Sequence, residues 1–430
     1  MKSLEDVEIM LVHPNNSVVY RNMRRSVLPN DKEHGKSNPI GLMYIAAVLQ
    51  DAGVGVSILD AEARNIMDEE KYIIDNYPDV VGYTATTPLV NTCNNIAGMI
   101  SYELDDVVQV IGGPHASAAP ETLLDKNFDF IVQGEGEPAA PLMFEAGRNK
   151  KAKMHGIYKT PIVDNLDALP FPARDLVDNS LYTNVYTGKP TTLVVTSRGC
   201  PYHCTFCGSG AIFGKKIRYR SPANVIAEMK EIVDVYKIHN VIISDDTFTM
   251  HRQRAIDIFN GMIENTLDIS FRFSTRVDRV DPELLGLAKE AGCDRITYGF
   301  ESGNNDILKS LRKGITIEQS REAVRMTKEA GIKILGNYMI GVPYDTEETI
   351  MQTIDFAKEL DTENAQFTIA IPLPGTEMEK TARDLGAIKS SNFDDYCFYY
   401  SPTIEHNLSK ERLLELQRYA YDTYRGGKQE

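Results

Sequence analysis

The chain has 430 residues, of which 42% are hydrophobic and 25% are charged, and its formal net charge is −15. This length predicts two or three domains, and the acidic balance disfavours extended nucleic-acid binding, which needs clustered lysine and arginine. No apolar run reaches the roughly 18 residues of a membrane-spanning helix, and the N-terminus does not resemble a signal peptide, so we expect a cytoplasmic protein.

Residues 1–150 are predicted to alternate between strands and helices. The expected strands are Val7–Val12, Val54–Leu59, Val80–Thr84, Val107–Ile111 and Phe130–Val132. Helical spacing between them, as in Ile40–Ala52 and Asn91–Ser101, implies a parallel sheet covered on both faces. We therefore predict an α/β domain with a Rossmann-like, doubly wound parallel sheet, whose ligands lie beyond the carboxyl ends of the strands.

The second half of the chain repeats this alternation after a proline-rich segment, 151–190, which we predict to be a linker. Six further strands are expected at Leu193–Thr196, Val241–Ser244, Ser270–Ser274, Arg295–Gly299, Ile334–Ile340 and Gln366–Ile371. Six strand–helix units are two short of a complete eight-fold barrel. Residues 191–385 are thus predicted to form a partial (β/α)6 TIM-like barrel, followed by a short helical tail, 386–430.

Three of the six cysteines, Cys200, Cys204 and Cys207, fall within eight residues directly after the first barrel strand. Their loop is thus expected at the carboxyl mouth of the barrel, where barrel active sites lie. Such a cluster favours a metal site over a disulfide framework. Three thiolates leave one iron of a [4Fe–4S] cube open, because complete ligation takes four cysteines. The alternative is zinc with His203 as fourth ligand, although zinc usually takes two separated pairs.

The spacing C-x-x-x-C-x-x-C resembles the signature of radical S-adenosylmethionine (SAM) enzymes. The resemblance implies that the open iron chelates SAM and that an electron, delivered by a donor such as flavodoxin or ferredoxin, cleaves SAM to a 5′-deoxyadenosyl radical. The protein then supplies orientation, redox tuning and exclusion of water. Phe206 matches the aromatic position that leans on adenine, with core packing as the alternative.

Further matches follow the later barrel strands in chain order. The SAM contacts that the resemblance implies are Asp245, Asp246, Thr247, Ser274, Arg276, Glu301, Ser302, Val342 and Pro343. Arg276 is expected to pair with the SAM carboxylate, Glu301 to bind the ribose, and Val342-Pro343 to pack on adenine. The sequence at Asp245 departs from the Gly-Gly-Glu of many members, and either aspartate could instead cap a helix.

Residues 1–150 resemble the cobalamin-binding domain that precedes the barrel in one large subgroup, the class B radical SAM methyltransferase-like enzymes. The implied cobalamin contacts at the strand ends are Thr84, Thr86, Gly112, Gly113, Pro114, His115 and Glu135. The motif Asp-x-His-x-x-Gly, whose histidine ligates cobalt, is absent, and His13 and His115 are candidate loop contacts. The alternatives are a scaffold that has lost cobalamin and, disfavoured because no glycine follows the first strand until Gly35, a nicotinamide site.

With both cofactors, the expected reaction is methylation of an unactivated carbon of a small-molecule or lipid-like substrate through methylcobalamin. The alternatives are a non-methylating radical reaction, such as ring formation or oxidation, and a non-catalytic iron–sulfur carrier. Methylthiotransferases of transfer RNA are less similar, because their N-terminal domain has its own cysteine triad and only Cys93 is available here. Tyr396, Tyr399 and Tyr400 in the tail are candidates for substrate contact or for packing.

Overall fold

The computed structural model describes residues 6–15, 36–149, 155–398 and 402–426, so Tyr399 and Tyr400 lie outside the described residues. The chain divides into two compact units, one built mainly from residues up to Pro190 and the other from Thr191 onward. No helix in the described ranges is both long and apolar enough to cross a bilayer.

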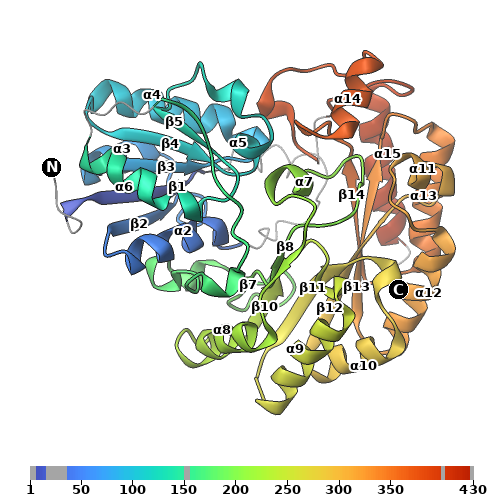
Figure 1. The fold of residues 1–430 in the computed structure, drawn as a ribbon. Helices are drawn as coiled ribbons and strands as arrows, with labels where there is room; N and C mark the ends of the chain where they lie inside the picture. Colours follow the sequence, from blue (N-terminus) through green and yellow to red (C-terminus); the bar gives the residue numbers. More distant parts are fainter. Residues whose placement is uncertain (1–5, 16–35, 150–154, 399–401, 427–430) are drawn as a thin grey trace. The chain divides into compact units, whose positions relative to one another are not determined.

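The first unit is a six-stranded parallel sheet in the order β2-β1-β3-β4-β5-β6 (Figure 1). Its strands are β1 (Glu8–His13), β2 (Gly55–Asp60), β3 (Val80–Thr84), β4 (Val108–Gly112), β5 (Phe130–Gln133) and β6 (Gly156–Lys159). The central strands are almost wholly buried, as expected of a sheet covered on both faces. The doubly wound fold predicted from the sequence is confirmed.

Helices cover the two faces of this sheet. The helices are α2 (Ile40–Asp51), α3 (Glu69–Asn76), α4 (Val90–Glu103), α5 (Pro114–Ala118) and α6 (Ala140–Arg148). Helices α2 and α6 pack together, as do α3 and α4. The segment predicted as a linker does more than connect, because it contributes β6, which pairs with β5.

The second unit is a curved parallel sheet in the order β14-β13-β12-β11-β10-β7. Its strands are β7 (Thr192–Val194), β10 (Asn240–Ile243), β11 (Ser270–Thr275), β12 (Cys293–Glu301), β13 (Lys333–Ile340) and β14 (Asn364–Ile369). A two-stranded ribbon, β8 (Ser197–Arg198) and β9 (Arg218–Tyr219), flanks the cysteine loop. Six strands in chain order confirm the partial barrel.

The barrel helices lie outside the curved sheet (Figure 1). They are α8 (Pro222–Asp234), α9 (Arg252–Glu264), α10 (Pro282–Glu290), α12 (Ile317–Glu329), α13 (Glu347–Leu360) and the tail helix α15 (Lys410–Gly426). The short helices α11 (Asn305–Ser310) and α14 (Glu377–Asp384) pack together near the turn after β13, and the one-turn α7 (Ser209–Ile212) belongs to the first unit. Many helices begin at a side chain that caps their first turn, as Ser221, Asp281 and Thr316 do. Apolar side chains from these helices and from the outer face of the strands form the larger core.

Candidate functional site

The cysteine loop is held at its start and at a second point within it. The buried Asp245 carboxylate follows β10 and accepts hydrogen bonds from the backbone amides of Thr196 (2.6 Å) and Ser197 (3.1 Å) and from both hydroxyls. Between Cys204 and Cys207, the Thr205 amide donates to the Leu311 carbonyl. Asp245, predicted to contact SAM, is thus a positioning residue for the loop in this structure, and burial raises the pKa of its carboxyl.

Cys200 and Cys204 lie between these anchors, and Cys207 follows the second anchor by two residues. Cys200 and Cys204 are half-buried, Cys207 is exposed, and none of the six cysteines, all within the described residues, forms a disulfide. Burial raises the pKa of the Cys204 thiol, and the charges of Lys313 and Arg276 oppose that rise. Within the described ranges no three His, Cys, Asp or Glu side chains converge on a single metal ion. A cube binds each thiolate at a different corner, so three accessible thiols on one anchored loop fit a [4Fe–4S] cluster.

A buried ion pair stands beside the loop at the end of β12. Lys313 Nζ lies 2.7 Å from Glu301 Oε1 and 5.8 Å from the centre of the Phe206 ring. Glu301 has a positive φ of 63°, a conformation that non-glycine residues rarely adopt. Such strain is typical of functional sites. The sequence did not single out Lys313, because no motif marks it and its pairing depends on the fold.

Arg276, at the end of β11, is held in place by several neighbouring groups. Its guanidinium makes two hydrogen bonds to the Asp278 carboxylate, of 2.8 and 3.1 Å, and donates to the Lys313 carbonyl at 2.7 Å. It also lies 3.6 Å from the centre of the Tyr202 ring, a cation–π contact. A SAM carboxylate would therefore have to share this guanidinium with Asp278.

The remaining predicted SAM contacts fall into two groups. Ser274 and Asp246 keep accessible side chains at the ends of β11 and β10. The other hydroxyls are buried and engaged within the barrel: Thr247 donates to the Asp246 carbonyl, and Ser302 bonds Thr353. The accessible side chains can meet a ligand, whereas the buried hydroxyls shape the loops.

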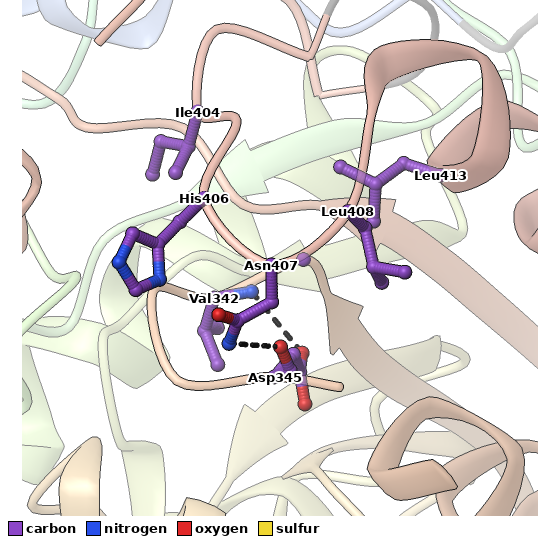
Figure 2. A pocket seen from close by; sticks show the side chains of 8 residues that line it. Val342, Asp345, Ile404, His406, Asn407, Leu408 and Leu413 are labelled. Carbon is purple, nitrogen blue, oxygen red and sulfur yellow. Dashed lines mark hydrogen bonds between the residues drawn. The ribbon is translucent and has the colours of Figure 1, made fainter. Parts of the chain in front are cut away.

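The turn after β13 brings Val342 and Phe206 into one apolar cluster. Residues from the tail line a small pocket on this turn (Figure 2). Asn407 Nδ2 donates to the Asp345 carbonyl at 2.8 Å, and His406 Nδ1 lies 3.1 Å from the Pro343 carbonyl. Two predicted adenine contacts thus lie together, and the tail supports the turn that carries one of them.

In the first unit, the loops that follow β3 and β4 come close together at the carboxyl edge of the sheet. Gly113 has φ +95°, and a Cβ there would meet Thr84 Oγ1 at 2.7 Å and the Ala85 amide at 2.9 Å. Thr84 is half-buried and Thr86 is exposed. A Cβ on Gly112 would make only an ordinary van der Waals contact, and Pro114 begins α5. Glycine alone fits at position 113. We call these strand ends the Gly113 cradle; they lie at the carboxyl edge of the sheet, where ligands of such folds bind.

Two predicted cobalamin contacts have internal partners instead. His115 is buried, with Nδ1 3.1 Å from Thr87 Oγ1 and Nε2 2.9 Å from Thr122 Oγ1, and burial lowers its pKa to about 4. Glu135 accepts from the Val163 amide at 2.6 Å and from Thr160 Oγ1 through its carbonyl. Both ring nitrogens of His115 are engaged, which disfavours it as a cobalt ligand.

Comparisons with known proteins agree with this geometry. Residues 194–357 match the radical SAM superfamily, and residues 31–143 match the B12 binding domain. An uncharacterized methyltransferase of Pyrococcus horikoshii is 35% identical over 90% of this chain and 87% of its own length. Cytidylyl-2-hydroxyethylphosphonate methyltransferase of Streptomyces wedmorensis is 28% identical over 79% of this chain and 77% of its own.

A solved structure shares the fold of both units. The radical SAM methyltransferase TsrM of Kitasatospora setae, determined with cobalamin and a [4Fe–4S] cluster, superposes with a TM-score of 0.68 at 19% identity, covering 89% of this chain and 79% of that one. The radical SAM and B12 binding domains together give this chain a [4Fe–4S] cluster, SAM and cobalamin as its cofactors. The cysteine loop, the glycine-lined strand ends and these matches establish that the chain belongs to the cobalamin-dependent radical SAM methyltransferase family.

Proposed function

We propose that this enzyme methylates an unactivated carbon of a small-molecule or lipid-like substrate. One observation carries the proposal: each unit has its own ligand-binding edge, with the anchored cysteine loop in one and the Gly113 cradle in the other. When bound, the cluster and SAM supply radical chemistry, and cobalamin supplies a carrier for the methyl group. A flavodoxin or ferredoxin is the proposed electron donor.

The chain's own residues bind and orient. Asp245 holds the start of the cysteine loop, and the Glu301–Lys313 pair presents a buried carboxylate and ammonium beside Cys204. Phe206 and Val342 form an apolar wall for adenine, and the Glu301 carboxylate is suited to hydroxyl groups of the ribose. These groups fix the cofactor's position and exclude water, which is the protein's contribution to radical chemistry.

The test is a product analysis with anaerobically reconstituted enzyme, cobalamin, reductant and SAM carrying a labelled methyl group. Methyl transfer requires both 5′-deoxyadenosine and S-adenosylhomocysteine, and label in the acceptor once an acceptor is found. Cys397→Ala replaces a buried cysteine outside the cluster. As a control for cysteine substitutions, it should form the same products as wild type. Formation of 5′-deoxyadenosine without any S-adenosylhomocysteine would contradict methylation and support ring formation or oxidation.

A further inference from the structure

His13 is held at the carboxyl end of β1 by a buried carboxylate on the neighbouring strand. Its Nδ1 lies 3.2 Å from Asp60 Oδ1, and the two residues are register partners at the ends of β1 and β2. The other oxygen of Asp60 accepts from the Tyr182 hydroxyl at 2.9 Å, and Oδ1 also accepts from the Ala63 amide at 2.9 Å. Asp60 and Tyr182 are buried, so the ring is fixed by groups that cannot turn away.

This arrangement determines which nitrogen of His13 remains for a ligand. The hydrogen bond with His13 counters the burial of Asp60 and holds the pKa of its carboxyl below the usual range, so Asp60 accepts and Nδ1 donates. Nε2 has no hydrogen-bond partner among the described residues, and the His13 side chain keeps 23% of its surface exposed. A histidine whose second nitrogen is oriented by a carboxylate is the arrangement that metal-binding sites use.

The position of His13 in the sheet points to the same ligand. In the order β2-β1-β3-β4-β5 the direction of winding reverses between β1 and β3, and ligands of such sheets bind at this switch point. His13 ends β1, and the accessible Thr84 ends β3 beside the Gly113 cradle. The imidazole therefore lies on the strand next to the cobalamin cradle.

We propose that His13 contacts the bound cobalamin through Nε2, with Asp60 and Tyr182 as its positioning residues. The inference rests on the cobalamin assigned above and is independent of whether the reaction is methyl transfer. The competing explanation is that His13 only ties β1 to β2 through Asp60. These two explanations predict different behaviour for His13→Asn.

The experiment is an anaerobic titration of the full-length, cobalamin-stripped protein with hydroxocobalamin, scored as the Kd. The amide nitrogen of His13→Asn reproduces Nδ1 and keeps the Asp60 bond while removing Nε2, so its Kd should rise about 10-fold or more, as in His13→Ala. Asp60→Asn should raise the Kd about 10-fold, the usual effect of removing an orienting partner. The control His239→Ala removes an exposed histidine that also pairs with an aspartate, Asp268, and should leave the Kd unchanged.

The Kd of His13→Asn distinguishes a contact with cobalamin from a purely structural role of His13. A wild-type Kd in His13→Asn would overturn the proposal, because it would show that the Asp60 bond alone matters. The electron paramagnetic resonance spectrum of the cob(II)alamin form then tells the two modes of contact apart. Nitrogen splitting that vanishes in His13→Asn shows a bond to cobalt, whereas weakened binding without such splitting shows a contact with the corrin periphery. Either result supports the proposal. Wild-type protein that takes up no corrinoid would instead contradict the cobalamin-dependent function itself.

Discussion

Because Gly299 has no side chain, the Glu301–Lys313 ion pair can occupy the space beside it. A Cβ at this position would overlap Glu301 Oε1 and lie 2.8 Å from Lys313 Nζ. Both partners are buried and joined to each other, so neither can withdraw without exposing an unpaired charge to the interior. The smallest side chain is therefore a requirement for the geometry of this corner of the barrel mouth.

We expect Gly299→Ala to weaken SAM binding about tenfold, or about 1.4 kcal/mol, while leaving the iron content unchanged. The Kd for SAM, followed through the change that SAM makes in the spectrum of the reduced cluster, is the measurement. Gly286→Ala is the matched control, because Gly286 lies in α10 with no atom within 4 Å of a new Cβ. That control should keep the Kd for SAM and stabilise the helix by up to about 1 kcal/mol.

His115 makes stability depend on pH. Burial lowers the pKa of this histidine from 6.5 to about 4, so the folded chain excludes a proton that the unfolded chain binds. The unfolding free energy should therefore be fully present above about pH 6.5 and fall as the pH drops toward 4, with His115 contributing on the order of 1–2 kcal/mol of that loss by pH 5. Denaturant titrations of wild type and His115→Gln between pH 5 and 7.5 test this, since the variant should show a smaller loss. Parallel curves would contradict it.

The sequence placed most site residues at the correct strand ends but not their partners. Cys200 and Gly113 stand in loops that follow apolar runs, and Glu301 is the last residue of β12; the carboxyl ends of parallel strands share one edge of the sheet. Whether a polar side chain in such a loop faces a ligand or a neighbour depends on contacts distant in sequence. Asp245 bonds to residues 49 and 48 positions earlier, and Arg276 bonds to a carbonyl 37 positions later, which no local pattern predicts.

At the scale of elements, the tail is a support for the turn after β13. Besides the bonds from His406 and Asn407, Leu413 of α15 packs 3.0 Å from the position of a Cβ on Gly341. Arg412 of the same helix pairs with Glu347 at the start of α13. The tail thus packs on the barrel at the turn that the sequence predicts to contact adenine.

The double variant His406→Ala, Asn407→Ala should loosen the Gly341–Asp345 turn. Each lost hydrogen bond is worth about 1 kcal/mol, so the Val342 amide, which donates to Asp345 Oδ2 at 3.1 Å, should exchange its hydrogen about tenfold faster. Hydrogen exchange followed by mass spectrometry measures this. Asn265→Ala removes a similar amide-to-carbonyl bond at the end of α9 and is the control. Unchanged exchange at Val342 in the double variant would show that the turn is held by Asp345 alone.

Long apolar strands were predictable to within one or two residues, whereas β6 was missed. Val80–Thr84 and Ile334–Ile340 carry enough buried apolar and aromatic residues to mark a strand by themselves. The four residues of β6 are only half-buried or exposed and stand in a proline-rich segment, so their structure comes from pairing with β5. Edge strands depend on a neighbour in this way, and a local pattern cannot reveal them.

At the scale of the whole molecule, the two units carry different cofactors on separate sets of residues. The cysteine loop and its anchors belong to the unit built mainly from Thr191 onward, and the Gly113 cradle and His13 belong to the other. Each unit has its own hydrophobic core. Because each core folds around its own sheet, loss of one cofactor should leave the binding site of the other intact.

Cys204→Ala should therefore abolish the cluster and spare the corrinoid. We expect iron and sulfide to fall to near background, because a cube left with two cysteine ligands is not retained, while the Kd for hydroxocobalamin stays within about twofold of wild type. His13→Asn should show the reverse pattern, with full iron content and weakened corrinoid binding. Metal, sulfide and corrinoid quantification on the same anaerobic preparations makes the comparison, and Cys397→Ala should retain both cofactors. Loss of corrinoid binding in Cys204→Ala would show that the two sites fold as one, contrary to the separate cores from which this expectation follows.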